Sequence, residues 1–223
     1  MLRVGLTGGL GSGKTTISAM FAAHGAHILS ADEIGRGLMQ PGNAVFGEIV
    51  RVFGTSIVTN SGSIDRAALA RSAFASGRIE ELNRIIHPAV IAEQEHRAQQ
   101  IFARDCNAVV IVESALIFEA SRGENIPGWH ERFDKLILVT SPERLKLDRF
   151  IARVSAGRTL SQAERTAIEV DGRARMAAQI PDAAKIPLCD YVLENSGSLK
   201  KTEEAVARIW ADLKQLSAAE PGS

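Results

Sequence analysis

Apolar runs of strand length alternate along this chain with stretches whose apolar residues recur at helical spacing. A strand that is apolar at every position, rather than at alternate positions, is typical of a parallel sheet covered by helices on both faces. The runs that predict strands lie at residues 2–6, 27–29, 108–112, 135–140 and 190–194. We therefore expect an α/β fold with a doubly wound sheet of about five parallel strands flanked by helices.

Helical spacing predicts the elements between these strands. One apolar helix face is formed by Val45, Ile49, Val52 and Phe53. Asp65 has the position of an N-cap for the helix that follows. Further helices are expected at 16–24, 33–40, 78–86, 88–104, after Ser141-Pro142, and at 199–216. Proline is tolerated in the first turn of a helix, so Pro88 and Pro142 are each expected to open one. The last residues, 217–223, are expected to fray.

The most specific motif follows the first predicted strand. Residues 8–15 read Gly-Gly-Leu-Gly-Ser-Gly-Lys-Thr and match the phosphate-binding pattern G-x-x-x-x-G-K-[ST] at every specified position. We call these residues the phosphate loop. Its glycines permit backbone angles closed to other residues, so successive N–H groups can surround phosphates at the positive N-terminus of the next helix. In this pattern Lys14 reaches the β- and γ-phosphates of a nucleotide, and the Thr15 hydroxyl binds Mg2+.

Charge and composition restrict the classes of partner. Lys and Arg together number 26, as do Asp and Glu, so the formal net charge is zero. A neutral chain argues against a nucleic acid or an anionic membrane as the main partner. No apolar run approaches the roughly 20 residues needed to cross a bilayer, and Met1 leads into the first strand without a signal segment. We expect a cytoplasmic enzyme whose two cysteines, Cys106 and Cys189, are reduced thiols.

Two carboxylates are expected near the phosphate loop, each where a predicted strand ends. Asp32 follows the strand at 27–29 and is the best-placed group to orient an acceptor hydroxyl and accept its proton; an Asp at this point can also cap the next helix. Glu113 follows the strand at 108–112, and it either holds Mg2+ through water or contacts the substrate. The chain has neither the Asn-Lys-x-Asp motif of GTPases nor the Leu-Ser-Gly-Gly-Gln signature of transport ATPases. A small-molecule kinase is therefore the favoured class.

A charged stretch between Ala152 and Ala177 has the composition of a helical lid. Arginines alternate there with acidic residues: Arg153, Arg158, Arg165, Arg173 and Arg175 with Glu164, Glu169 and Asp171. Such a segment alone is typical of a solvated helix pair. Beside a phosphate loop, it favours a lid whose arginines close over the transferring phosphoryl group and exclude water. At 223 residues, the chain is expected to be one P-loop kinase domain, 1–223, with a helical substrate-binding region at about 33–105 and the lid at about 150–178.

Several landmarks together resemble the dephospho-coenzyme A kinases. They are, in order, Leu6 to Thr15, Ser30-Ala31-Asp32-Glu33-Ile34, Ile86-His87-Pro88, Leu116-Ile117-Phe118-Glu119 and Glu194-Asn195-Ser196-Gly197-Ser198-Leu199. The resemblance implies transfer of the γ-phosphoryl group of ATP to the 3′-hydroxyl of dephospho-coenzyme A, the last step of coenzyme A synthesis. It implies Mg2+ as the cofactor and a P-loop NTPase-type sheet with a helical acceptor-binding segment and a lid. We expect a monomer or a weak homo-oligomer.

The resemblance also implies roles for single residues. ATP would be bound by Gly9, Gly11, Ser12, Gly13, Lys14, Thr15, Thr16 and Asn195. Asp32 would address the acceptor hydroxyl, and catalysis would also use Lys14, Arg149 and Arg153. Arg149 and Arg153 match basic positions at the start of the family's lid, and Arg175 and Gln179 match positions at its end. His87 either helps to form the acceptor pocket or is a helix-start histidine bonded locally. Asn195 approaches the adenine or is a simple turn residue.

Two departures from the family pattern affect these assignments. The chain has Glu113-Ser114-Ala115-Leu116-Ile117 where the family commonly has Asp-x-Pro-Leu-Leu, so the contact made by Glu113 is open. The lid is also longer than usual, with the extra residues within 155–173, which leaves Arg158 and Arg165 unassigned. The remaining alternatives are a nucleoside or nucleoside monophosphate kinase, whose acceptor specificity would lie in 41–104, and a regulatory P-loop ATPase that binds a protein.

Overall fold

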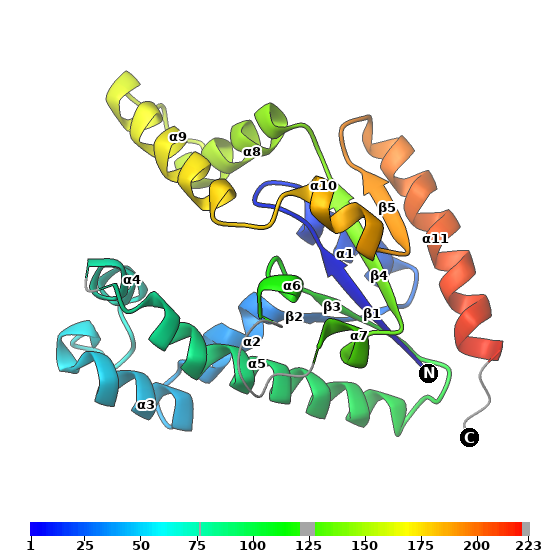
Figure 1. The fold of residues 1–223 in the computed structure, drawn as a ribbon, viewed down its shortest axis with the longest axis horizontal. Coiled ribbons are helices and arrows are strands. Elements are labelled where there is room, and N and C mark those ends of the chain that lie inside the picture. The colour runs from blue at the N-terminus through cyan, green and yellow to red at the C-terminus, as the bar shows by residue number, and fades with distance from the viewer. Residues whose placement is uncertain (76, 121–127, 220–223) are drawn as a thin grey trace. The chain divides into compact units, whose positions relative to one another are not determined.

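The computed structural model describes residues 1–75, 77–120 and 128–219 (Figure 1). Five strands form one sheet in the order β2-β3-β1-β4-β5. The strands are β1 (Leu2–Thr7), β2 (His27–Ser30), β3 (Val109–Glu113), β4 (Lys135–Thr140) and β5 (Tyr191–Glu194). β1 pairs in parallel with both β3 and β4, and β4 pairs in parallel with β5. The predicted α/β fold with a parallel sheet is confirmed, with the strands where the apolar runs predict them.

Helices occupy most of the chain between the strands. They are α1 (Lys14–Ala23), α2 (Ala31–Leu38), α3 (Ala44–Phe53), α4 (Arg66–Ala75), α5 (Ile79–Phe102), α6 (Ile117–Ala120), α7 (Trp129–Arg132), α8 (Glu143–Ser155), α9 (Gln162–Ala177), α10 (Asp182–Lys185) and α11 (Leu199–Ala219). Two 3-10 turns, η1 (Thr55–Ile57) and η2 (Ile186–Leu188), complete the elements described.

The chain forms two compact units. The first contains residues 1–28 and the chain from 101 onward, and the second contains residues 29–100. The second unit has nearly the bounds of the helical region expected at 33–105. Its role in substrate binding, and the description of the whole chain as one kinase domain, stay predictions.

The core of the first unit lies on the sheet. Val4, Ile111 and Ile137 of the strands are buried in one cluster with Phe21 of α1 and Val206 of α11. Figure 1 shows α11 running beside β5. Burial of this apolar surface is the main force that fixes α1 against the sheet, and therefore fixes the phosphate loop at the carboxyl end of the central strand β1.

The second unit has its own apolar core. Ile49 and Phe53 of α3 are buried with Leu69 of α4 and Leu82 of α5, which confirms the helix face predicted for 45–53. Asp65 caps α4 as predicted, because its Oδ1 accepts hydrogen bonds from the N–H groups of Ala67 and Ala68, at 2.9 Å each.

Three predictions about helix ends are wrong. Residues 78–86 and 88–104 were expected as two helices, but α5 is continuous with Pro88 inside it. Pro88 removes one N–H from the helix and its ring crowds the carbonyl four residues earlier, but burial of Leu82 and Val90 on either side favours the continuous helix. Ser141 does not cap α8; its hydroxyl donates to the carbonyl oxygen of Asn195 at 2.8 Å, and Pro142 occupies the N-cap instead of the first turn.

The third wrong end is that of α11. The helix continues to Ala219, so residues 217–219 are helical where fraying was expected, and 220–223 lie outside the described residues. Ser217 is buried, and its hydroxyl donates to the Lys214 carbonyl oxygen at 3.0 Å, so this last turn is ordered. Within the described ranges, no helix has the length and apolar character needed to cross a membrane. Cys106 and Cys189 are both free thiols, and burial raises the pKa of the Cys189 thiol to about 11.

Candidate active site

The phosphate loop joins β1 to α1 through three glycines with positive φ, a backbone conformation that favours glycine. Gly8 has a φ angle of +155°. Gly11 and Gly13 have φ angles of +72° and +94°. A Cβ atom on Gly11 would clash with the carbonyl oxygen of Lys146, and one on Gly13 would clash with the Asn195 side chain. Gly13 is also the N-cap of α1, and no side chain caps the helix there. The first turn of α1 is therefore built to leave backbone N–H groups for an anionic ligand.

Lys14 is folded back across the loop. Its Nζ donates to the carbonyl oxygens of Gly8 at 2.8 Å and Gly9 at 3.2 Å. These bonds keep the ammonium group at the start of the loop, close to the backbone that surrounds phosphate in proteins with this motif. Thr16, in the first turn of α1 just after the loop, donates its N–H to the Gly13 carbonyl oxygen at 3.1 Å.

Glu113 lies beside the first turn of α1. Its Oε1 accepts a hydrogen bond from the Thr15 hydroxyl at 2.8 Å, and its Oε2 accepts one from the Ser18 hydroxyl at 3.0 Å. The parallel register between β1 and β3 explains this approach, since Leu6 is opposite Glu113 and both strands end at the same edge. Ser18 was missed by the sequence analysis, although its i+3 position after Thr15 places it on the same helix face.

Thr15 and Glu113 are the pair best suited to a metal ion. Hydroxyl and carboxylate oxygens are ligands that Mg2+ accepts, and Mg2+ usually keeps several waters with one or two carboxylates. Among the described residues, no cluster of three or more His, Cys, Asp and Glu side chains could hold a metal by itself. This donor set therefore fits an ion bound jointly with nucleotide phosphates, and does not fit a metal enclosed by protein ligands alone.

Arg149 and Asn195, which lie outside the phosphate loop, both bond to Ser12 within it. Arg149 Nη1 donates to the Ser12 carbonyl oxygen at 3.3 Å, and its Nη2 donates to the Asn195 carbonyl oxygen at 2.9 Å. The Asn195 Nδ2 donates to the same Ser12 oxygen at 2.9 Å, and its Oδ1 accepts from the Thr202 hydroxyl at 3.2 Å. Because Asn195 is buried and bonded at both ends of its amide, it is more than an exposed turn residue.

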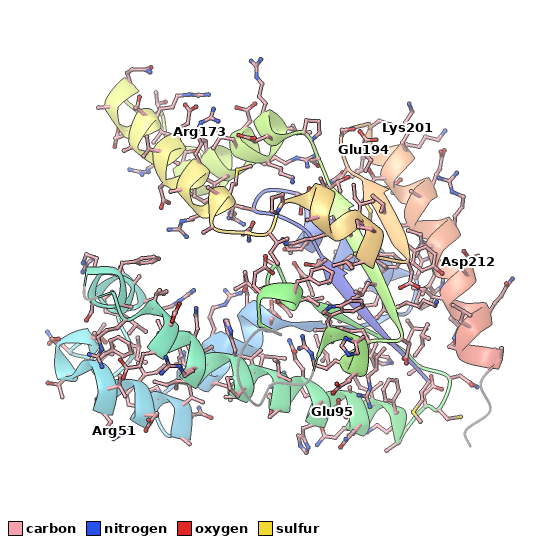
Figure 2. The ribbon with its side chains drawn as sticks, in the orientation of Figure 1. Arg51, Glu95, Arg173, Glu194, Lys201 and Asp212 are labelled. Atoms are coloured by element: carbon pink, nitrogen blue, oxygen red, sulfur yellow. The ribbon has the colours of Figure 1, made fainter. Side chains whose placement is uncertain are left out.

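Arg153 and Arg175 lie on the two helices of the predicted lid, and both guanidinium groups lie near the same aromatic ring. Their guanidinium carbons are 5.6 and 5.9 Å from the Phe150 ring centroid. α9 approaches α8 closely at Gly172, where a Cβ atom would come within 2.8 Å of the Phe150 ring. Arg173 extends from α9 toward α8 (Figure 2) and pairs with Glu143 at 3.0 Å.

The segment after α9 returns to the phosphate loop. Gln179 Oε1 accepts a hydrogen bond from the Leu10 N–H at 2.9 Å, and Asp182 forms an ion pair with Lys146 of α8. These residues line a cavity of about 440 Å³ that also includes Gly9 of the loop. Lys146 and Asp182 were missed by the sequence analysis because they are 36 positions apart and no local pattern links them.

Asp32 and His87 belong to the second unit. Asp32 is exposed in the first turn of α2. The cap of this helix is Ser30, whose hydroxyl accepts from the Glu33 N–H at 3.4 Å, so the capping role considered for Asp32 is wrong. His87 is half-buried in the interior of α5, so it is not a helix-start histidine.

The first unit, by contrast, brings several predicted site residues together. The loop residues lie with Glu113, Arg149 and Asn195 through the hydrogen bonds described above.

Related proteins match almost the whole chain. The family model described as dephospho-CoA kinase matches residues 2–201. A dephospho-CoA kinase of Syntrophotalea carbinolica is 34% identical over 214 residues, which cover 96% of this chain and 92% of the relative. One of Corynebacterium jeikeium is 34% identical over 215 residues, covering 96% of this chain and all of the relative.

A solved structure has the same fold and similar length. The crystal structure of TT1252 from Thermus thermophilus is 30% identical, has a TM-score of 0.70, and the match covers 95% of this chain and 97% of that one. The family assignment is supported by the landmarks in the sequence, by the geometry of the phosphate loop and by the length of the match. The chain belongs to the dephospho-CoA kinase family.

Proposed function

We propose that this chain transfers the γ-phosphoryl group of ATP to the 3′-hydroxyl of the ribose of dephospho-CoA, giving CoA and ADP. The observation that carries the proposal is the phosphate loop, in which Thr15 is hydrogen-bonded to Glu113. The dephospho-CoA kinase family model matches residues 2–201, which include this loop and the other landmarks of the sequence. The similarity to proteins named dephospho-CoA kinase supports dephospho-CoA as the acceptor.

The loop and its supports bind the nucleotide in this proposal. The N–H groups of the loop and the first turn of α1 receive the phosphates, and the Lys14 Nζ exchanges its carbonyl partners for phosphate oxygens. Arg149 and Asn195 act on the same loop, because both donate to the Ser12 carbonyl oxygen. Asn195 is then a residue that shapes the ATP site, whether or not it also touches the adenine.

Thr15 and Glu113 would hold Mg2+ when ATP is bound. Held there, Mg2+ would supply positive charge that offsets the negative charge developing on the phosphates. The 2.8 Å bond from Thr15 to Glu113 favours the metal role of Glu113 over direct contact with dephospho-CoA. Glutamate, one methylene longer than aspartate, spans this distance while its second oxygen bonds to Ser18.

Acceptor activation is assigned to Asp32. Its carboxylate orients the 3′-hydroxyl of dephospho-CoA and receives its proton as the phosphorus–oxygen bond forms. Arg153 and Arg175 of the lid supply positive charge to the transferring group and help to exclude water, which would otherwise accept the phosphoryl group. His87 contributes to the acceptor pocket. The cytoplasmic location and the monomer or weak homo-oligomer stay predictions.

The acceptor is tested by measuring ADP release with ATP and Mg2+. Dephospho-CoA is compared with adenosine, AMP, CMP and no acceptor, and CoA is identified as the product. Release that depends on dephospho-CoA supports the proposed reaction. A preference for a nucleoside or a monophosphate would assign the chain to a neighbouring kinase activity, and equal slow release in every reaction would indicate a regulatory ATPase.

Replacement of Lys14 by Ala should weaken both ATP binding and turnover. The bonds from the Lys14 Nζ to the Gly8 and Gly9 carbonyl oxygens hold the ammonium group at the loop, so its loss removes positive charge from the phosphate site. We expect a fall in kcat of about 10²-fold or more, because such groups act on charge that develops in the transition state. Steady-state kinetics and ATP titration measure the two effects, and unchanged activity would contradict the phosphate-loop assignment.

A further inference from the structure

Lys146 contacts the phosphate loop with both its backbone and its side chain. A Cβ atom on Gly11 would clash with the Lys146 carbonyl oxygen, so α8 lies directly against the loop at this point. The Lys146 Nζ is 3.2 Å from the position that a Cβ atom on Gly9 would occupy. Both glycines are thus covered by one residue at the base of α8.

The side chain of Lys146 joins the start of the predicted lid to its end. Its ion pair with Asp182 is largely buried, with 9% of the Lys146 side chain and 19% of the Asp182 side chain exposed. Asp182 is the first residue of α10, and it follows closely after Gln179, which accepts the Leu10 N–H. The two ends of the α8–α9 segment are therefore fixed to each other and to Gly9, Leu10 and Gly11.

The ion pair has a geometric role rather than a large stabilising one. A buried ion pair gains little stability over an apolar pair of similar volume, because both charges must leave water. The ion pair instead favours one relative position of the Lys146 and Asp182 side chains over others. The Gly9 carbonyl oxygen also accepts a hydrogen bond from the Lys14 Nζ, so a shift of Gly9 changes the position of the Lys14 ammonium group.

We propose that Lys146 and Asp182 form a latch that fixes the base of the lid against residues 9–11 of the phosphate loop. Both are positioning residues for phosphoryl transfer, acting through the loop and Lys14, and this assignment rests on the proposed kinase function. The second half of the loop has separate supports, since Arg149 and Asn195 bond to Ser12. Loss of the latch should therefore impair the use of ATP more than the binding of ADP.

The test uses Lys146→Met, Asp182→Asn, and the double variant Lys146→Met with Asp182→Leu. Each single variant should lower kcat about tenfold, with the Kd for ADP changed less than about threefold. The double variant should recover most of the lost kcat, because an apolar pair of similar volume can maintain the same contact. The matched control is Asp148→Asn, which removes an exposed α8–α9 pair with Arg165 and should leave kcat unchanged.

Limited trypsin digestion gives a readout that does not require an acceptor. Arg158 is exposed in the turn between α8 and α9, and cleavage there should be faster in both single variants than in the parent. If the parent does not phosphorylate dephospho-CoA, the proposed function fails, while the latch is still judged from cleavage rates and from ATP and ADP binding.

Two results would overturn the latch. If Lys146→Met weakens ATP binding while Asp182→Asn strengthens it, Lys146 is a phosphate ligand that Asp182 restrains. If both variants lose ATP and ADP binding equally and also unfold at lower temperature, the pair is only structural.

Discussion

Replacement of Asp32 by Asn is expected to lower kcat by about 10²- to 10⁴-fold, the range typical of a lost general base, while ATP binding stays nearly unchanged. Asp32 is exposed in the first turn of α2, and its side chain caps no helix, because Ser30 has that role. Asn keeps the shape of the side chain but neither carries the charge nor accepts a proton. The effect therefore falls on the acceptor side of the reaction.

The measurement separates the two substrates. Steady-state kinetics with dephospho-CoA give kcat, and ATP binding is followed by titration without acceptor. Glu33→Gln is the matched control, since Glu33 is the exposed neighbour in the same turn and only its backbone N–H bonds to Ser30. The control should retain kcat within about threefold. A similarly small effect of Asp32→Asn would remove Asp32 from the catalytic assignment.

An intermediate result is also informative. Phosphoryl transfer passes through a loose transition state that needs little proton removal at an early stage. If Asp32 only orients the hydroxyl, Asn should retain part of the activity because its amide can still hydrogen-bond. A loss near tenfold that does not vary with pH would support orientation, whereas a larger loss would support proton transfer.

The fold could be predicted where the signal is local. Runs of apolar residues located the strands, and the full phosphate-binding motif located the turn between β1 and α1. The Asp65 cap was also predicted, because a capping side chain bonds to N–H groups two and three residues ahead. Each of these features depends on neighbours within one helical turn or one strand.

The sequence did not reveal contacts between distant segments. The bond from Asn195 to Ser12 spans 183 positions, and it depends on the order β1-β4-β5, which brings the end of β5 toward the loop. The continuity of α5 through Pro88 has the same kind of cause, since tertiary burial of Leu82 and Val90 overrides the local signal of proline. Motifs supplied candidate residues for the site, but long-range packing determines which of them touch.

Replacement of Lys185 by Met is expected to cost about 3 kcal/mol of unfolding free energy, the lower end of the range for one lost partner of a buried ion pair. Lys185 has no exposed surface, and its Nζ is 3.1 Å from Oε1 of Glu119, whose side chain is 17% exposed. Without the ammonium group, the carboxylate is left largely buried without its counter-charge. In a chain of this size, this corresponds to a fall in Tm of roughly 6–12 °C.

The double variant Lys185→Met with Glu119→Gln distinguishes an isolated charge from lost packing. Glu119 Oε1 also accepts the Ile180 N–H at 3.0 Å, and the oxygen of Gln can keep that bond while removing the charge. The double variant should therefore regain much of the stability that Lys185→Met loses, since no unpaired charge remains. Lys135→Met is the control, because Lys135 pairs with Asp190 at 2.9 Å near the surface, where such pairs contribute less than about 1 kcal/mol. Thermal and urea unfolding measure the stability of all four proteins. If Lys185→Met and Lys135→Met lose equal unfolding free energy, burial of the Lys185 ion pair adds nothing to its contribution to stability.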